Sequence, residues 1–204
     1  MIDQLKEKNI AIENLISALN NIDHQYLNMK YDRIVGGFQK PERLFNAELY
    51  HQLRKIQEDI NVATELTKVK LHIELVKTPR IEVHPCIGDY RPRKISPDVV
   101  FHNSQNDTTN QLLVAEIKME GASWVKIGKD FQKLLFYKLS RLQFKNAVFI
   151  YTGSKDALEE ILFRFSNNFL RCLQDNEIII VLPKMQQNEK YNWEVYNINL
   201  QNHE

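Results

Sequence analysis

Two apolar runs that carry charged residues constrain this chain most. PDVVF (97–101) and LLVAEIKM (112–119) have the composition of buried strands, and polar, turn-rich residues join them. This pattern predicts two neighbouring antiparallel strands. Asp98 opens the first run, and Glu116 and Lys118 lie near the end of the second. Burying an unpaired charge is costly, so these groups must either satisfy one another or hold something.

Strand alternation places Glu116 and Lys118 on one face, and a hairpin would bring Asp98 beside Glu116. Two adjacent carboxylates repel each other, and a divalent cation would relieve that repulsion. Oxygen ligands without a thiol favour Mg²⁺ or Mn²⁺ over zinc. Such an ion can activate a water for phosphodiester hydrolysis, with Lys118 orienting or deprotonating the water or neutralising charge. The alternative is a solvent-exposed Glu116–Lys118 pair on an edge strand.

The rest of the chain alternates between helical and extended patterns. We expect a first helix over about 2–28 in an N-terminal helical arm (1–38) for packing or dimerisation, then a second helix over about 41–60. LHIELV (71–76) fits either a helix end or a strand. After the motif strands we expect a helix (130–144), a strand (145–153), a helix (156–174) and two strands (177–184 and 192–200). This order predicts an α/β or α+β domain over 39–204, with a central mixed β-sheet flanked by helices.

Composition narrows the class of protein. The net charge is +1 and 26% of residues are charged, as in an ordinary globular domain. Cys86 and Cys172 are far apart and form no CxxC motif, so we expect neither a disulfide framework nor a zinc site. No stretch approaches 18 apolar residues and the N-terminus carries acids, so we expect a cytoplasmic protein without a signal peptide or membrane span.

The motif SPDVVF followed by LLVAEIK resembles that of the PD-(D/E)XK nuclease superfamily, whose fold is restriction-endonuclease-like. Pro97-Asp98 is followed after 17 residues by Glu116-Ile117-Lys118, and the resemblance covers roughly residues 41–153. In that family a helix precedes the motif strands, and a helix and another strand follow. The resemblance implies a metal-dependent nuclease, most often acting on DNA. Asp98, Glu116 and the Ile117 carbonyl would bind Mg²⁺ or Mn²⁺, and Lys118 would position or activate water.

The family often has a further glutamate that reaches the metal from the first helix of the fold, and Glu42 and Glu48 are the candidates. Glu48 lies about 60° from Phe45 on a helical wheel, at the edge of the apolar stripe, where it can point along a cleft. Glu42 lies within the stripe but in the first turn, where it can simply favour the helix N-terminus. We therefore prefer Glu48.

Candidate nucleic-acid contacts flank the motif. The family often places a polar residue and a lysine on the following helix, which here offers Asp130, Gln132, Lys133 and Tyr137. Lys133 and Tyr137 are four residues apart and could meet a phosphate backbone, although a solvated face with a partly buried Tyr137 is equally consistent. The predicted DNA contacts are Arg91, Arg93, Lys94, Lys129, Gln132, Lys133 and Tyr137. An ordinary solvated helix with a basic loop is the alternative.

Other functions stay open from the sequence. A catalytically inactive nuclease-fold protein could bind nucleic acid or a protein partner, although the intact Asp98, Glu116 and Lys118 favour an enzyme. A helical assembly protein acting through its N-terminal arm, with a possible homodimer through the first helix, is another alternative. Trp124 follows the second motif strand and can either stack on a base or pack at the rim of the core.

Overall fold

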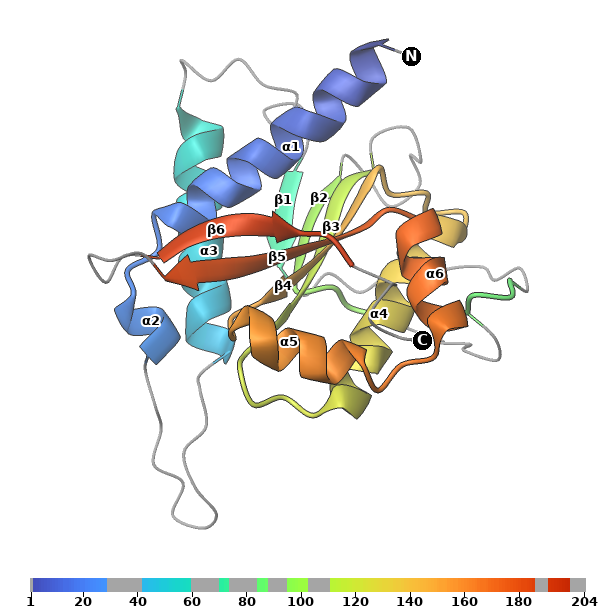
Figure 1. Ribbon diagram of the computed structural model, residues 1–204. Coiled ribbons are helices and arrows are strands. Elements are labelled where there is room, and N and C mark those ends of the chain that lie inside the picture. The colour runs from blue at the N-terminus through green and yellow to red at the C-terminus, as the bar shows by residue number, and fades with distance from the viewer. Residues whose placement is uncertain are drawn as a thin grey trace.

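The chain forms one six-stranded mixed β-sheet with helices on both faces (Figure 1). The computed structural model describes residues 2–28, 42–59, 70–73, 84–87, 95–102, 111–185 and 191–198. Its helices are α1 (Ile2–Asn20), α2 (Gln25–Asn28), α3 (Glu42–Glu58), α4 (Trp124–Leu139), α5 (Lys155–Leu162) and α6 (Asn167–Asp175). Its strands are β1 (Lys70–Ile73), β2 (Val99–His102), β3 (Gln111–Lys118), β4 (Asn146–Tyr151), β5 (Ile178–Met185) and β6 (Tyr191–Tyr196). The prediction of a mixed sheet flanked by helices is confirmed.

The strands lie in the sheet in chain order, from β1 to β6. β1, β2 and β3 form an antiparallel meander, as the motif hairpin predicts, and β6 is antiparallel to β5. β3, β4 and β5 are parallel, because α4 connects β3 to β4, and α5 with α6 connects β4 to β5. The helical crossovers therefore place β3 and β4 in the middle of the sheet.

Two hydrophobic cores sandwich the sheet. Alternate residues of β3, such as Leu113 and Ile117, pack with α1 and α3 on one face, whereas Val114 packs with α4 and α6 on the other. Every residue of β4 is buried, as expected for a central parallel strand. Figure 1 shows the same division, with α1 and α3 on one side of the strands and α4, α5 and α6 on the other.

The helix α1 belongs to the core. Ala11, Leu15, Ala18 and Leu19 are buried against α3 and the sheet, because their helical spacing forms one apolar stripe. The predicted first helix is shorter than expected, since a turn at residues 21–24 separates it from α2. The proposed arm boundary at residue 38 lies outside the described residues. A homodimer through α1 stays a prediction, and it would have to use the face of α1 opposite this stripe.

Two helices differ from their predicted limits. The predicted helix over 130–144 begins at Trp124 and ends at Leu139, since Gly128 is tolerated inside it. The single helix predicted over 156–174 is broken into α5 and α6 by a turn at residues 163–166. Ser166 begins α6 because its hydroxyl accepts a hydrogen bond from the Phe169 N–H at 3.3 Å. No helix among the described residues has the length and apolar character needed to cross a membrane.

A disulfide joins Cys86 to Cys172 of α6, with the Cα atoms 5.5 Å apart. The expectation of no disulfide framework rested on their separation of 86 residues along the chain. The fold brings them together because Ile87, next to Cys86, packs in the same core as Leu170 and Leu173 of α6. The chain therefore contains a single covalent cross-link, which the sequence analysis did not predict.

Reduction of this disulfide should destabilise the fold. Closing a loop of this length restricts the unfolded chain, so its loss should lower the free energy of unfolding by about 2–5 kcal/mol. Guanidinium unfolding with and without reductant measures the difference. The double variant Cys86→Ser/Cys172→Ser is the control, because reductant should leave its midpoint unchanged. Equal midpoints for the oxidised and reduced natural chain would contradict the prediction.

Candidate functional site

Glu116 and Lys118 lie at the end of β3 and point toward α4, as strand alternation predicts. Ile117, between them, packs into the opposite core. The side chain of Glu116 is 1% exposed and that of Lys118 is 15% exposed. The two charged groups therefore lie beneath α4, on the part of β3 that extends beyond its pairing with β2.

Asp98 occupies the place where the β2 ladder ends. The last paired residues of β2 and β3 are Val99 and Ala115, so the Ile117 N–H beyond them has no strand partner on that side. The Asp98 Oδ2 accepts a hydrogen bond from this N–H at 2.7 Å. The hairpin thus brings Asp98 beside the motif end of β3, as the sequence predicts.

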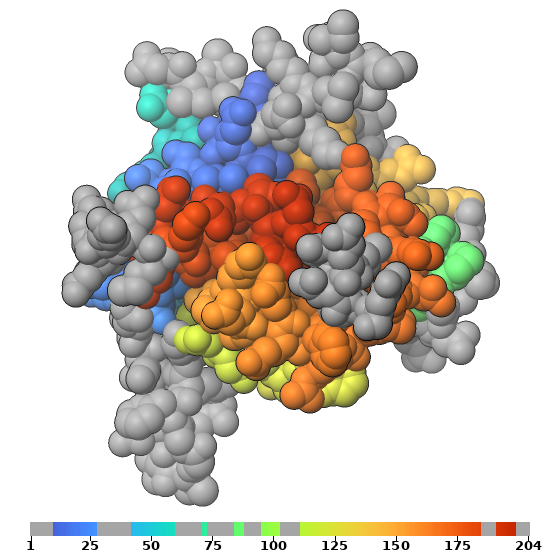
Figure 2. Space-filling model, in the orientation of Figure 1, coloured from blue at the N-terminus to red at the C-terminus, as the bar shows by residue number. Residues whose placement is uncertain are grey.

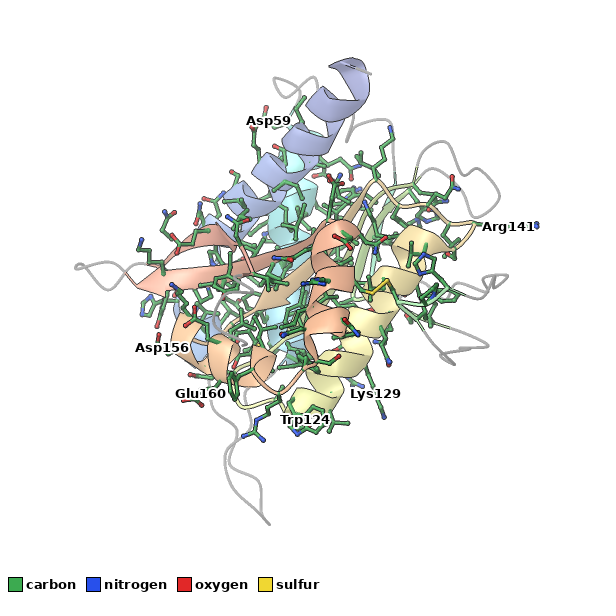
Figure 3. The ribbon with its side chains drawn as sticks, turned by 45° about the vertical axis from the view of Figure 1, so that its right-hand side comes forward. Asp59, Trp124, Lys129, Arg141, Asp156 and Glu160 are labelled. Carbon is green, nitrogen blue, oxygen red and sulfur yellow. A yellow bond between two sulfur atoms is a disulfide. The ribbon has the colours of Figure 1, made fainter. Side chains whose placement is uncertain are left out.

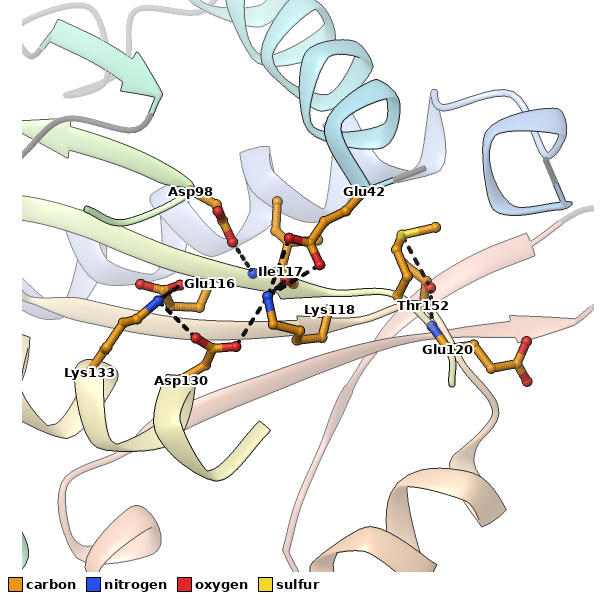
Figure 4. Close-up of polar contacts among 10 residues, drawn as sticks. Glu42, Asp98, Glu116, Ile117, Lys118, Glu120, Asp130, Lys133 and Thr152 are labelled. Atoms are coloured by element: carbon orange, nitrogen blue, oxygen red, sulfur yellow. Dashed lines mark hydrogen bonds and ion pairs between the residues drawn. The ribbon is translucent and has the colours of Figure 1, made fainter. Parts of the chain in front are cut away.

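Ion pairs connect the rest of the site in a continuous chain, which Figure 4 shows. Lys118 Nζ lies 3.2 Å from Glu42 Oε2 and 3.2 Å from Asp130 Oδ2. Lys133 Nζ lies 2.8 Å from Asp130 Oδ1 and 2.9 Å from Glu116 Oε2. Asp130 on α4 therefore joins the two lysines, and the chain runs from α3 across α4 to β3.

The Glu116 carboxylate is only half satisfied. Its Oε2 accepts a hydrogen bond from Lys133, but its Oε1 is buried without a hydrogen-bond partner among the described residues. A buried carboxylate oxygen without a partner costs about 1–3 kcal/mol or more. A further ligand on this oxygen would offset that cost.

Burial raises the pKa values of both motif acids. The pKa of Asp98 rises from 3.8 to about 6, mainly because burial disfavours its charged form, although the Ile117 N–H and Lys118 oppose the rise. The pKa of Glu116 is raised well above its ordinary range by burial and by the nearby Asp98 charge, against the opposing effect of Lys133. The two carboxylates therefore interact with each other, as predicted.

Both lysines are held in the charged form. Burial alone would lower the pKa of Lys118, but Asp130, Glu42 and Asp98 outweigh it, and the net pKa is raised. The pKa of Lys133 is also raised, because Glu116 and Asp130 outweigh its burial. In this arrangement Lys118 serves as a fixed positive charge, and its high pKa makes it a poor base for water.

Donors for a metal ion are few at this site. In the part of the chain that the structure describes, no group of three or more His, Cys, Asp or Glu side chains could hold a metal ion. The candidate ligands are two carboxylates, Asp98 and Glu116, with the carbonyl of Ile117, which accepts a hydrogen bond from Lys118 at 3.0 Å. Mg²⁺ often binds through one or two carboxylates and keeps several waters, so this small set suits it.

The structure places Glu42, and not the preferred Glu48, beside Lys118. Glu48 accepts a hydrogen bond from Gln52 Nε2 at 2.6 Å and raises the pKa of Tyr26, so it belongs to a different environment. Glu42 instead reaches Lys118. Glu42 is the first residue of α3, on its apolar stripe, and its side chain reaches Lys118 at the end of β3.

The residues predicted on α4 have separate roles. Lys133 pairs with the buried acids and Lys129 is exposed, while Gln132 is half-buried. Tyr137 is fully buried and packs edge-on against Phe144, so it cannot contact a phosphate backbone as proposed. Tyr137 lies one turn after Lys133 on the same face of α4, but that face is covered by the core at Tyr137.

The predicted basic residues Arg91, Arg93 and Lys94 lie outside the described residues. Asp130 was noted only as one polar residue of its helix, yet it is 3% exposed and joins both lysines. The sequence feature that could have indicated this role is the position of Asp130 on the apolar stripe of α4, between Ile127 and Leu134.

Comparison with models of protein families, with curated proteins and with solved structures finds nothing that matches this chain.

Replacing Asp98 with Asn should stabilise the protein above pH 6. Between about pH 4 and 6 the folded Asp98 keeps a proton that the unfolded chain loses, so the contribution of Asp98 to stability falls as pH rises through this window and then levels off. Asp98→Asn mimics the neutral form and still accepts from the Ile117 N–H. It should gain up to about 3 kcal/mol at pH 7 without added metal.

Chemical unfolding from pH 4 to 8 measures this effect. Asp156→Asn, at an exposed position on α5, is the control and should follow the natural pH profile. Parallel profiles for Asp98→Asn and the natural chain would show that Asp98 is not buried as described.

Proposed function

We propose that this protein is a metal-dependent nuclease of the PD-(D/E)XK type that hydrolyses phosphodiester bonds in DNA. The observation that carries the proposal is the buried Glu116 Oε1, which has no hydrogen-bond partner among the described residues. The Glu116 carboxyl also interacts with the charge of Asp98, which raises the pKa of Glu116. A protein that needed only a stable core would gain by replacing these acids with apolar residues.

Asp98, Glu116 and the Ile117 carbonyl would hold Mg²⁺ or Mn²⁺. When bound, such an ion polarises a phosphate oxygen and lowers the pKa of a water. The protein contributes the positions of these ligands. Asp98 is fixed by its hydrogen bond to the Ile117 N–H, and Glu116 by its ion pair with Lys133.

The charge of the site supports a divalent ion. Four acids and two lysines form the cluster, and it has a net charge of −2 when all are ionised: Glu42, Asp98, Glu116, Asp130, Lys118 and Lys133. A divalent cation would neutralise it. Since charges are costly to bury without compensation, this match favours Mg²⁺ over a monovalent ion.

Lys118 would act as a fixed charge for the phosphate. Glu42 and Asp130 hold its ammonium from two sides, and its raised pKa keeps the proton on the nitrogen. A positive charge held in place before the reaction stabilises negative charge that develops on phosphate oxygens. Of the roles considered from the sequence, orienting and neutralising fit this geometry, and deprotonating water does not.

The order of elements supports a restriction-endonuclease-like core. α3 precedes the motif strands β2 and β3, and α4 and β4 follow them, which is the order expected for the superfamily. The proposed acids lie on the hairpin, and the helices on either side contribute Glu42, Asp130 and Lys133.

A catalytically inactive nuclease fold is the second candidate. Lys133 neutralises Glu116 at 2.9 Å and could take the place that a metal would fill. The protein would then bind nucleic acid or a partner without cleaving it. Activity measurements distinguish this candidate from the first.

The natural protein should nick supercoiled plasmid DNA with Mg²⁺ and lose this activity in EDTA. Asp98→Asn and Glu116→Gln should each lower the rate by about a hundredfold or more, the size expected for an electrostatic contributor to the reaction. Gel densitometry over time measures the rate. Glu194→Gln, a change to an exposed acid on β6, is the control. Nicking that survives both site variants would exclude this site.

Glu42→Gln and Glu48→Gln form a matched pair on α3. Glu42→Gln should reduce nicking about 10–100-fold, because it removes an ion-pair partner of Lys118. Glu48→Gln should stay within about twofold of the natural rate, since Glu48 contacts Gln52 instead. The reverse order of effects would restore Glu48 as the functional glutamate.

A further inference from the structure

An exposed aromatic corner lies where α4 begins and α5 ends. The side chains of Trp124 and Phe163 are 43% and 68% exposed, and neighbouring Val125 is 46% exposed. Three of the five exposed large hydrophobic residues among the described residues therefore gather here. Figure 2 shows that the start of α4, in yellow-green, and α5, in orange, form one continuous surface.

The corner is held rigid from below. The Trp124 ring meets Phe165 edge-on with the centroids 6.0 Å apart, and Phe165 also contacts Phe131 and Phe169. Gly128 permits this packing, because a Cβ there would lie 2.9 Å from the Phe165 ring. Phe163 is two residues from Phe165 and so at most about 7 Å away along the backbone. The exposed Trp124 ring therefore rests on a packed aromatic base, next to Phe163.

Exposed cations lie on the same two elements as these rings, and those of α4 are on a different face of the helix from Trp124. Lys126 and Lys129 are exposed on the first turns of α4, and Arg164 is exposed between Phe163 and Phe165. Glu160 is an exposed acid of α5, three residues before Phe163, and Figure 3 labels it together with Trp124 and Lys129 of α4. We name Trp124, Phe163, Lys126, Lys129 and Arg164 the aromatic–basic surface. Its charge is positive and its exposed rings are suited to stacking.

We propose that the aromatic–basic surface binds single-stranded DNA, with unpaired bases stacked on Trp124 and Phe163 and phosphates paired with Lys126, Lys129 and Arg164. Aromatic rings stack on the faces of unpaired bases, whereas duplex bases already stack on each other. A protein partner with an apolar surface would leave the three cations unused, so the charge favours a polyanion.

The surface connects to the candidate site along α4. Lys126, Lys129 and Lys133 are spaced at i, i+3 and i+7, so they share a face that extends about 10 Å along the helix. Lys133 pairs with Glu116 at the other end of this row. The choice of DNA rests on the proposed function, but binding at the surface needs neither metal nor cleavage. The two ideas can therefore fail separately.

Fluorescence titration tests the surface directly. The chain has two tryptophans, and Trp193 is buried, so Trp193→Phe leaves Trp124 as the single fluorophore. Oligothymidylate in EDTA should quench its emission saturably, and a duplex of equal length should bind more weakly. In the natural background, Trp124→Ala should weaken binding about tenfold in fluorescence anisotropy with labelled oligothymidylate. Val195→Ala, a change at a similarly exposed apolar residue on β6, should have no effect.

The cations give an independent arm. Replacing Lys126, Lys129 and Arg164 with Ala should lower the salt dependence of log K by about 2. Glu160→Gln should tighten binding. Lys184→Ala, at an exposed position on β5, is the control.

Several outcomes would overturn the proposal: no binding of oligothymidylate, equal binding by the duplex, binding that Trp124→Ala leaves unchanged, or binding of oligouridylate alone. A homodimer in sedimentation that Trp124→Ala dissociates would assign the surface to a second copy instead. If oligothymidylate binds as expected but Mg²⁺-dependent nicking is absent, the surface stands and the nuclease proposal fails.

Discussion

The hydrogen bond from the Ile117 N–H to Asp98 is the contact on which the candidate site depends. β2 stops pairing with β3 at Val99, and β3 continues for three more residues beyond Ala115. Without a partner strand, the buried N–H of Ile117 needs an acceptor, and the Asp98 carboxylate supplies it. The same gap in the sheet lets Glu42 reach Lys118 from the α3 side. Because β2 ends early, side chains from the helices on both faces of the sheet reach Lys118.

The site is a compromise between charge and burial. The ion pairs among Lys118, Asp130 and Lys133 compensate part of the cost of taking these groups out of water. Two carboxylates with raised pKa values and one oxygen of Glu116 without a partner are left over. Proteins often give up stability in this way at functional sites. The excess of negative charge is the physical basis for proposing a cation here.

Local patterns in the sequence predicted what local geometry controls. Alternation along a strand was enough to place Glu116 and Lys118 on one face, and the turn-rich connection was enough to place Asp98 beside them. Contacts between distant elements were not predictable in this way. Which glutamate reaches Lys118 depended on how α3 packs against the end of β3, and the pairing of Cys86 with Cys172 depended on how α6 packs. The full burial of Tyr137 was not predictable either, because its spacing from Lys133 does not show where the helix enters the core.

The disulfide separates the charged residues of the site into those inside its loop and one outside it. Asp98, Glu116, Lys118, Asp130 and Lys133 all lie between Cys86 and Cys172, so one covalent ring carries them. Glu42 lies outside that ring, on a helix that non-covalent contacts hold against the sheet. Partial opening of the α1–α3 layer would then withdraw Glu42 while the ring kept the other charged groups together. Five charged residues of the cluster therefore belong to one disulfide-closed loop, whereas Glu42 comes from a segment that can separate from it.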